Sequence, residues 1–246
     1  MRGRKAQITA IVFIVIILAV VILLVTMFVR SHYYDNLKSK ITRGAVIAPE
    51  MIPITETVQD CLEQVSIDGV RLIGLQGGVL DPQSYIETEF SRVSYGYDNG
   101  EDLASLRVIS GELKSFIDVA LPLCFNEELF SEFEIELEGV SSSVKIGNKI
   151  EIKTSYPFRA VKNDVEFHVD ADYETVLDFD LKSAHETARE IINEISKDPE
   201  YIHISSLASM DYDVAVLTVG DEYIYSVTDL DGLEGIPYSF MFGVRI

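Results

Sequence analysis

The acidic segment Asp229-Leu-Asp231-Gly232-Leu-Glu234 comes closest to a metal site among the residue patterns of this sequence. Calcium prefers oxygen ligands, and alternating carboxylates with a glycine turn supply them from one short loop. The segment is shorter than an EF-hand loop and lacks its distant bidentate glutamate. We predict that Asp229, Asp231 and Glu234 are weak candidates for a Ca²⁺ site, with turn formation by solvated carboxylates as the ordinary alternative.

Three other patterns that resemble catalytic motifs favour structural roles. The glycines of Gly74-Leu-Gln-Gly77-Gly78 follow a predicted helix and lack the Gly-Lys-Ser/Thr ending of a phosphate-binding loop. His185-Glu186 begins like a zinc-protease motif, but Arg189 occupies the place of its second histidine. The segment Phe133-Glu-Ile-Glu-Leu-Glu138 alternates strictly, so its glutamates are expected on the solvent side of a strand. We therefore predict no catalytic residue and no cofactor, and a hydrolase with scattered carboxylates is the enzymatic alternative.

The chain begins with a segment suited to crossing a membrane. The 22 residues from Ile8 to Val29 carry no charge, and a helix of that length spans the roughly 30 Å hydrocarbon core of a bilayer. A cleaved secretion signal has a shorter apolar region followed by small residues. Here Arg30, Tyr33 and Tyr34 follow, as is typical of a membrane interface. We predict one transmembrane helix at Ile8–Val29, with the lipid bilayer as its partner.

The basic leader, residues 1–7, has two interpretations. It ends in Ala6-Gln7 directly before the apolar run, and this pattern resembles the class III (type IV prepilin-like) signals of archaeal surface proteins. In that family a peptidase removes the leader and leaves the apolar helix on the mature chain. The resemblance therefore implies cleavage between Ala6 and Gln7. The alternative is an uncleaved signal anchor whose basic residues stay in the cytoplasm.

Two cysteines, Cys61 and Cys124, bear on the cellular compartment. Neither a CxxC motif nor a Cys/His cluster accompanies them, which disfavours a zinc site. A single disulfide is the economical interpretation, and two buried free cysteines are the alternative. Since disulfides persist in oxidising compartments, the pair favours an extracytoplasmic domain. Flanking charges leave the orientation open, because basic residues lie on both sides of Ile8–Val29.

A second resemblance covers most of the chain. Val58-Gln-Asp-Cys61-Leu62, the glycines of 74–78 and Leu121-Pro-Leu-Cys124 resemble segments of uncharacterised single-span archaeal membrane proteins. This resemblance implies a single-span topology and pairing of the two cysteines, and it implies nothing about chemistry.

Charge is divided unevenly along the sequence. The net charge of the 246 residues is −20, yet residues 1–43 hold seven basic residues and one acidic residue. Residues 44–246 therefore carry 13 basic and 39 acidic residues, a net charge of −26. Such a charge repels phosphate backbones, so nucleic acid is excluded as a partner.

Hydrophobic periodicity predicts an α+β fold behind the anchor. Helices are expected from Thr55 to about Gly74, from Glu101 to Pro122, and from Ser183 to about Lys197. Alternating segments predict strands, including a hairpin with its turn at Gly147-Asn148. The expected strands are 133–138, 144–146, 149–153, 165–169, 173–181, 212–219, 222–227 and 238–246.

The predicted order of domains follows from these elements. A leader (1–7), a transmembrane helix (8–29) and a stem (30–54) precede a helical subdomain (55–124) and a mainly antiparallel β subdomain with one packed helix (125–246).

Together these features predict a single-pass cell-membrane protein with an extracytoplasmic C-terminal domain. Its expected role is structural or interactive, for example as a pilin-like surface subunit that forms homo-oligomers or binds envelope proteins. The alternative is a membrane-tethered accessory or sensor domain that binds a ligand or a cation.

Overall fold

The computed structural model describes residues 48–98, 101–198 and 204–245. The predicted leader, the predicted transmembrane helix and most of the predicted stem lie outside these residues. The chain divides into units 1–43 and 44–246, and the fold described below is that of the second unit. No helix in the described ranges has both the length and the apolar character to span a membrane.

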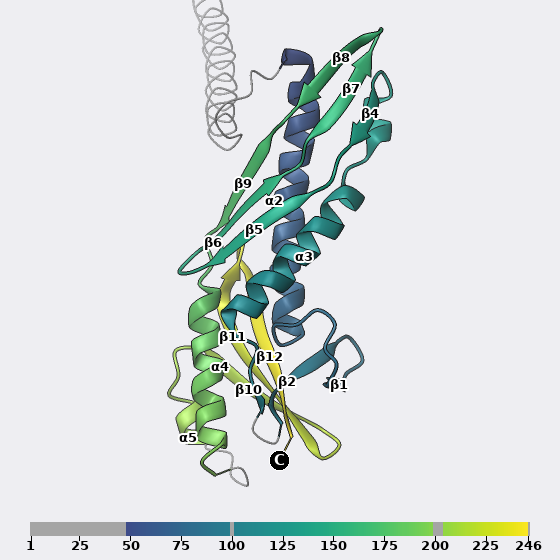
Figure 1. Ribbon diagram of the computed structural model, residues 1–246. Helices are drawn as coiled ribbons and strands as arrows, with labels where there is room; N and C mark the ends of the chain where they lie inside the picture. The colour runs from purple at the N-terminus through teal and green to yellow at the C-terminus, as the bar shows by residue number, and fades with distance from the viewer. Residues whose placement is uncertain (1–47, 99–100, 199–203, 246) are drawn as a thin grey trace, which may run out of the picture. The chain divides into compact units, whose positions relative to one another are not determined.

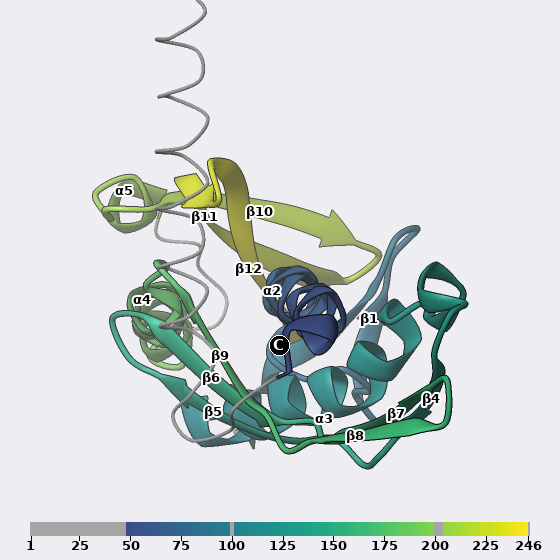
Figure 2. The ribbon, with the colours of Figure 1, turned by 90° about the horizontal axis from the view of Figure 1, so that it is seen from above.

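The first long helix forms the centre of the fold. A 3₁₀ turn, η1 (Pro49–Met51), leads into α2 (Ile52–Leu75), so the helix begins three residues before the predicted start at Thr55. Pro53 is tolerated there because N–H groups in the first turn of a helix have no hydrogen-bond acceptor within the helix, so the N–H that proline lacks is not missed. Buried residues occur along the whole length of α2, and Figure 2 shows α2 surrounded by other elements.

Glycines end α2 and allow its packing. Gly77 and Gly78 have φ values of 75° and 91°, and the Gly78 N–H donates to the Ile73 carbonyl at 2.8 Å. This is the geometry of a helix C-cap. At Gly69 a Cβ would lie 2.7 Å from the side chains of Leu113 and Phe116, so the glycine lets the second long helix approach closely.

That second helix, α3 (Leu106–Cys124), begins later than predicted. Its N-cap is Ser105, whose side chain accepts from the Val108 N–H, whereas Glu101–Asp102 form the short strand β3. A predicted start at acidic residues was wrong because a serine four residues later supplies the cap. The helix also continues two residues past Pro122. Two hydrogen bonds join α3 to a neighbouring strand. The Ser110 hydroxyl donates to the Val144 carbonyl oxygen, and Asp118 Oδ1 accepts from the Ser142 N–H.

Two three-stranded antiparallel sheets follow α3 and a second 3₁₀ turn, η2 (Glu127–Phe130). Their strands are β4 (Glu134–Leu137), β5 (Ser141–Ile146), β6 (Ile150–Ser155), β7 (Phe158–Lys162), β8 (Val165–Val169) and β9 (Asp172–Leu177). The orders are β4-β7-β8 and β5-β6-β9. Backbone hydrogen bonds from Glu138 to Pro157 and from Tyr156 to Ala171 lie where the chain passes between the sheets. Figure 1 shows the two sheets end to end as one long curved layer beside α2 and α3.

A mixed sheet and a helix complete the unit. Its strands are β1 (Tyr85–Glu87), β2 (Arg92–Asp98), β3 (Glu101–Asp102), β10 (Asp213–Val219), β11 (Glu222–Leu233) and β12 (Ile236–Arg245). The order is β1-β2-β12-β11-β10 with β3 on β2, and the β2–β12 pair is parallel. Helix α4 (Leu181–Ile195) packs on β11 and β12, and a single turn, α5 (Ile204–Leu207), follows. In Figure 2, α2 lies between this sheet and the long curved layer.

The α+β prediction is confirmed, with differences in detail. The strands predicted after residue 125 are present, although β9 ends at Leu177 and β11 extends to Leu233. Strands β1 and β2 lie within the segment 55–124 that was predicted to be helical, and β7 was not predicted. Strand β1 has only three residues, and the alternation of β7 is broken by the adjacent Ala160 and Val161. In β2, Val93, Tyr95 and Tyr97 do alternate with polar residues and glycine, and this signal was overlooked. One core cluster runs from Met51 to Val244 and includes both predicted subdomains.

Candidate functional site

An acidic cleft is the candidate site of the described unit. Its volume is about 500 Å³, and its lining comes from the start of α4, the segment before β10, and the middle of β11. The cleft is lined by Ser183, Asp211, Tyr212, Asp213, Thr228, Asp229, Leu230 and Asp231. A second hollow of about 220 Å³ shares Ser183, Asp211 and Tyr212 with it. Four aspartates therefore share one open, polar recess.

The β11 side of the acidic cleft is a local turn. Asp229 Oδ1 accepts hydrogen bonds from the N–H groups of Asp231 at 3.0 Å and of Gly232 at 3.2 Å. Gly232 has a φ of 58°, and a Cβ there would lie 1.9 Å from the Ile236 carbonyl oxygen. Only glycine therefore fits this turn. The β11–β12 register shifts between Asp229 and Leu233, and this irregularity directs the segment 229–231 into the cleft.

The opposite side of the cleft is formed by Tyr212 and the first turn of α4. Burial raises the pKa of Tyr212, a hydrogen bond to Ser183 opposes that shift, and the charges of Asp229, Asp180 and Asp211 add to it. Asp180 caps α4 because its Oδ1 accepts from the Ser183 N–H at 2.9 Å. The neutral phenol thus contributes a hydroxyl beside several carboxylates, an arrangement suited to a cation or a hydrated polar ligand.

The predicted Ca²⁺ candidates are only partly brought together. Asp229 and Asp231 line the acidic cleft, whereas Glu234 is outside its lining and occupies the two-residue hairpin turn after Leu233. Glu234 and Gly235 have φ values of 55° and 70°, as a type I′ turn requires. Across the described ranges, no group of three or more His, Cys, Asp or Glu side chains is arranged to hold a metal ion.

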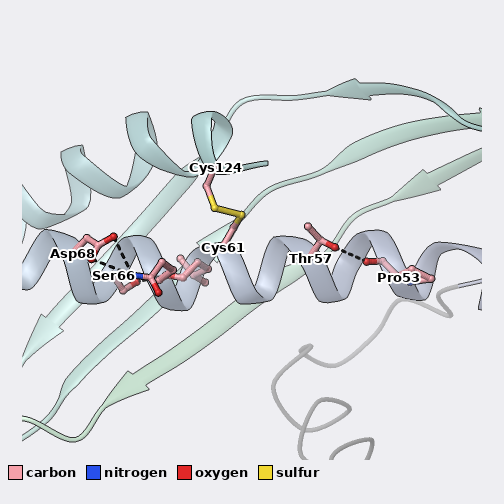
Figure 3. The surroundings of a disulfide bond; sticks show 8 residues. Pro53, Thr57, Cys61, Ser66, Asp68 and Cys124 are labelled. Atoms are coloured by element: carbon pink, nitrogen blue, oxygen red, sulfur yellow. Dashed lines mark hydrogen bonds between the residues drawn. A yellow bond between two sulfur atoms is a disulfide. The ribbon is translucent and has the colours of Figure 1, made fainter. Parts of the chain in front are cut away.

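A disulfide joins the two long helices. Cys61 of α2 and Cys124 at the end of α3 are bonded, with their Cα atoms 5.8 Å apart and a sequence separation of 63. Figure 3 shows the bond spanning the gap between the helices. Of the two alternatives left open by the sequence, the structure contains the disulfide.

The other sequence motifs have structural positions. The glycines of 74–78 end α2, as described above. His185 is 2% exposed, and its Nε2 lies 2.8 Å from the Ala104 carbonyl oxygen while its ring packs edge-on against Phe240. The exposed Glu136 pairs with Arg159 at 2.8 Å across the β4–β7 pair. These motifs therefore connect elements of the fold.

Most residues that line the cleft were not predicted from the sequence. Tyr212 was predicted only as the start of a strand, and Asp211 and Asp213 were not considered. The Asp-Tyr-Asp pattern before a strand is the one local signal for this side of the cleft. These lining segments come together because α4 packs against β11, a contact between parts of the chain that are distant in sequence. The segments are residue 183 and residues 211–213 and 228–231.

Sequence reasoning also missed a charged network that closes the parallel strand pair. Arg245 of β12 donates to Glu222 at 2.9 Å, to Asp98 at 3.0 Å and to the hydroxyl of Tyr95, and its guanidinium lies 4.2 Å from the centre of the Tyr95 ring. Tyr95 in turn donates to Glu222 at 2.5 Å. The network joins β2, β11 and β12.

This network makes the stability of the fold depend on pH. The hydrogen bond from Tyr95, followed by that from Arg245, lowers the pKa of Glu222. A carboxylate whose pKa is lowered by folding stabilises the protein above its unfolded pKa, and the contribution is lost as pH falls through the folded value. At about pH 7, the wild-type protein should therefore unfold at a higher temperature than Glu222→Gln. In acid, this difference in unfolding temperature should vanish. Thermal unfolding followed by circular dichroism across pH measures this difference, with exposed Glu138→Gln as the charge control. A difference that does not change with pH would contradict the assignment.

No protein-family model matches the chain, and neither the curated proteins nor the solved structures include a significant match.

Proposed function

We propose that this protein is a single-pass membrane protein whose unit 44–246 lies outside the cytoplasm and serves there as a structural or interaction domain. The observation that carries the proposal is the Cys61–Cys124 disulfide, because such bonds persist in oxidising compartments. The uncharged run Ile8–Val29 supports the anchor. The resemblance of the leader to class III signals supports a more specific proposal, a pilin-like surface subunit whose mature chain begins at Gln7.

Protease treatment of intact cells tests the placement. If unit 44–246 is outside, protease added to cells should degrade it while a cytoplasmic marker protein stays intact. Extraction of membranes at high pH should leave the full chain in the pellet, because Ile8–Val29 holds it in lipid. A chain that is protected in intact cells but degraded in lysed cells would overturn the external placement. A chain released by alkaline extraction would overturn the anchor.

The acidic cleft supports a second function, binding of a cation by a membrane-tethered accessory or sensor domain. Asp211, Asp213, Asp229 and Asp231 line one recess of about 500 Å³. No three of them are grouped as direct metal ligands, so it is their combined negative charge that favours a hydrated cation there. This function competes with a purely structural role, and ligand-dependent stability separates the two.

Calcium should raise the thermal midpoint of fragment 44–246 if the cleft binds it. At 100 times the dissociation constant the gain is about 2.7 kcal/mol. Asp213→Asn combined with Asp229→Asn should abolish the gain because two of the four negative charges that line the cleft are lost. Asp221→Asn, at an exposed turn between β10 and β11, should leave it intact. An equal response of all three proteins to Ca²⁺ would place cation binding elsewhere.

A further inference from the structure

Strand β10 lies at the end of the mixed sheet. It pairs with β11 through seven consecutive residue pairs, from Asp213–Thr228 to Val219–Glu222, and it is the last strand in the sheet order. Among the described elements, β11 is the one with which β10 makes extensive contact. The other edge of a terminal strand presents backbone N–H and C=O groups that can pair with a further strand.

The residues of β10 do not protect this edge. Folded proteins usually place charges or proline on edge strands to prevent pairing. Most other edge strands of the described sheets carry a charge inside the strand: Glu136 in β4, Lys145 in β5, Glu166 in β8 and Glu174 in β9, while Glu87 ends the three-residue β1. In β10 the charge is confined to the first residue, Asp213, and the six residues from Val214 to Val219 contain neither a charge nor proline.

Both faces of β10 are apolar near its middle. Val214 and Val216 are partly buried and pack against the main core. Ala215 and Leu217 point to the other face, where both are exposed and Leu217 is 50% exposed. A partner strand must therefore be apolar on both faces as well.

The charge of the unit limits where a second copy can make contact. Residues 44–246 carry a net charge of −26, so two copies repel one another over most of their surfaces. The uncharged β10 edge is a strip where two copies can meet without opposing carboxylates. A second copy of β10 is itself apolar on both faces, so it meets the requirement for the partner strand. A two-fold axis relates identical strands in antiparallel orientation, which gives a closed dimer.

We propose that β10 pairs edge to edge with β10 of a second copy of this chain, antiparallel and centred on Val216. This register places Ala215 of one copy opposite Leu217 of the other and keeps the two Asp213 residues at opposite ends of the pair. The result is one continuous sheet across two copies. This inference deepens the proposed interaction role by naming the partner and the contact surface.

Fragment 44–246 is suited to the test because it is a compact unit with its own core and disulfide. Sedimentation velocity over a concentration series should show a monomer–dimer equilibrium. In Ala215→Glu/Leu217→Glu, four carboxylates face one another across the dimer axis, and like charges opposite one another destabilise a strand pair. The dissociation constant should therefore rise by about tenfold or more. Thermal unfolding checks that the variant is folded.

Two further variants make the test specific. Ala215→Lys/Leu217→Glu places opposite charges across the proposed register and should retain the dimer. Leu129→Glu changes a side chain that is 68% exposed on η2 and should dimerise like wild type. A wild-type fragment that stays monomeric, or a dimer that the paired glutamates do not weaken, would overturn the β10 contact. Neither result bears on the membrane anchor, which protease treatment and alkaline extraction test separately.

Discussion

Replacing both cysteines, Cys61→Ala/Cys124→Ala, should lower the free energy of unfolding of fragment 44–246 by about 4 kcal/mol. The bond closes a loop with a sequence separation of 63 residues, and the chain-entropy model assigns a stabilisation of this size to such a loop. The cost is large because the bond fixes α2 and α3, the two helices on which the curved layer and the mixed sheet pack. Urea unfolding monitored by circular dichroism measures the loss.

Reductant provides the control for this prediction. Dithiothreitol should lower the stability of the wild-type fragment toward that of the double variant, and it should leave the variant unchanged. A wild-type fragment that unfolds at the same urea concentration with and without reductant would contradict a stabilising disulfide.

Adding a single methyl group at Gly74 should also lower the free energy of unfolding. In Gly74→Ala the new Cβ would lie 2.5 Å from the Tyr238 hydroxyl oxygen and 2.6 Å from the backbone carbonyl oxygen of Ser239. Because Ser239 belongs to β12, the helix and the sheet must move apart to admit it. We expect a loss of about 2 kcal/mol, as is typical of overpacked cores, measured by urea unfolding.

Gly111→Ala is the matched control. Gly111 lies inside α3 on an exposed face, and no heavy atom is within 4 Å of a Cβ built there. Alanine is favoured over glycine in a helix by about 1 kcal/mol, so this variant should be more stable than wild type. Equal effects of the same substitution at both positions would contradict the close packing of α2 on β12.

Strong local patterns explain how much of the fold was predictable. The helical period of α2 and α4 continues over several turns, and the β5–β6 hairpin combines strict alternation with a turn at Gly147-Asn148. Such elements carry enough sequence information to be recognised alone. The pairing of the two cysteines was also accessible, because only one intramolecular pair exists.

Long-range packing explains what could not be predicted. The parallel β2–β12 pair joins Tyr95 to Gly243, and no local pattern encodes a partner so distant in sequence. The start of α3 was misplaced because acidic residues and a serine both offered N-terminal signals. The acidic cleft combines three separate segments, of which the turn at Asp229 alone was recognised from the sequence as a candidate site. Its other residues became evident once α4 was placed on β11.

The most direct test of the proposed placement is intact-mass spectrometry of the full chain from native membranes, after thiol alkylation without reduction. The account predicts a membrane-bound chain with no alkylated cysteine, which corresponds to the Cys61–Cys124 bond, and a chain that starts at Gln7 if the leader is processed as in pilin-like proteins. A chain recovered from the soluble fraction with both cysteines alkylated would contradict the anchor and the oxidising compartment together.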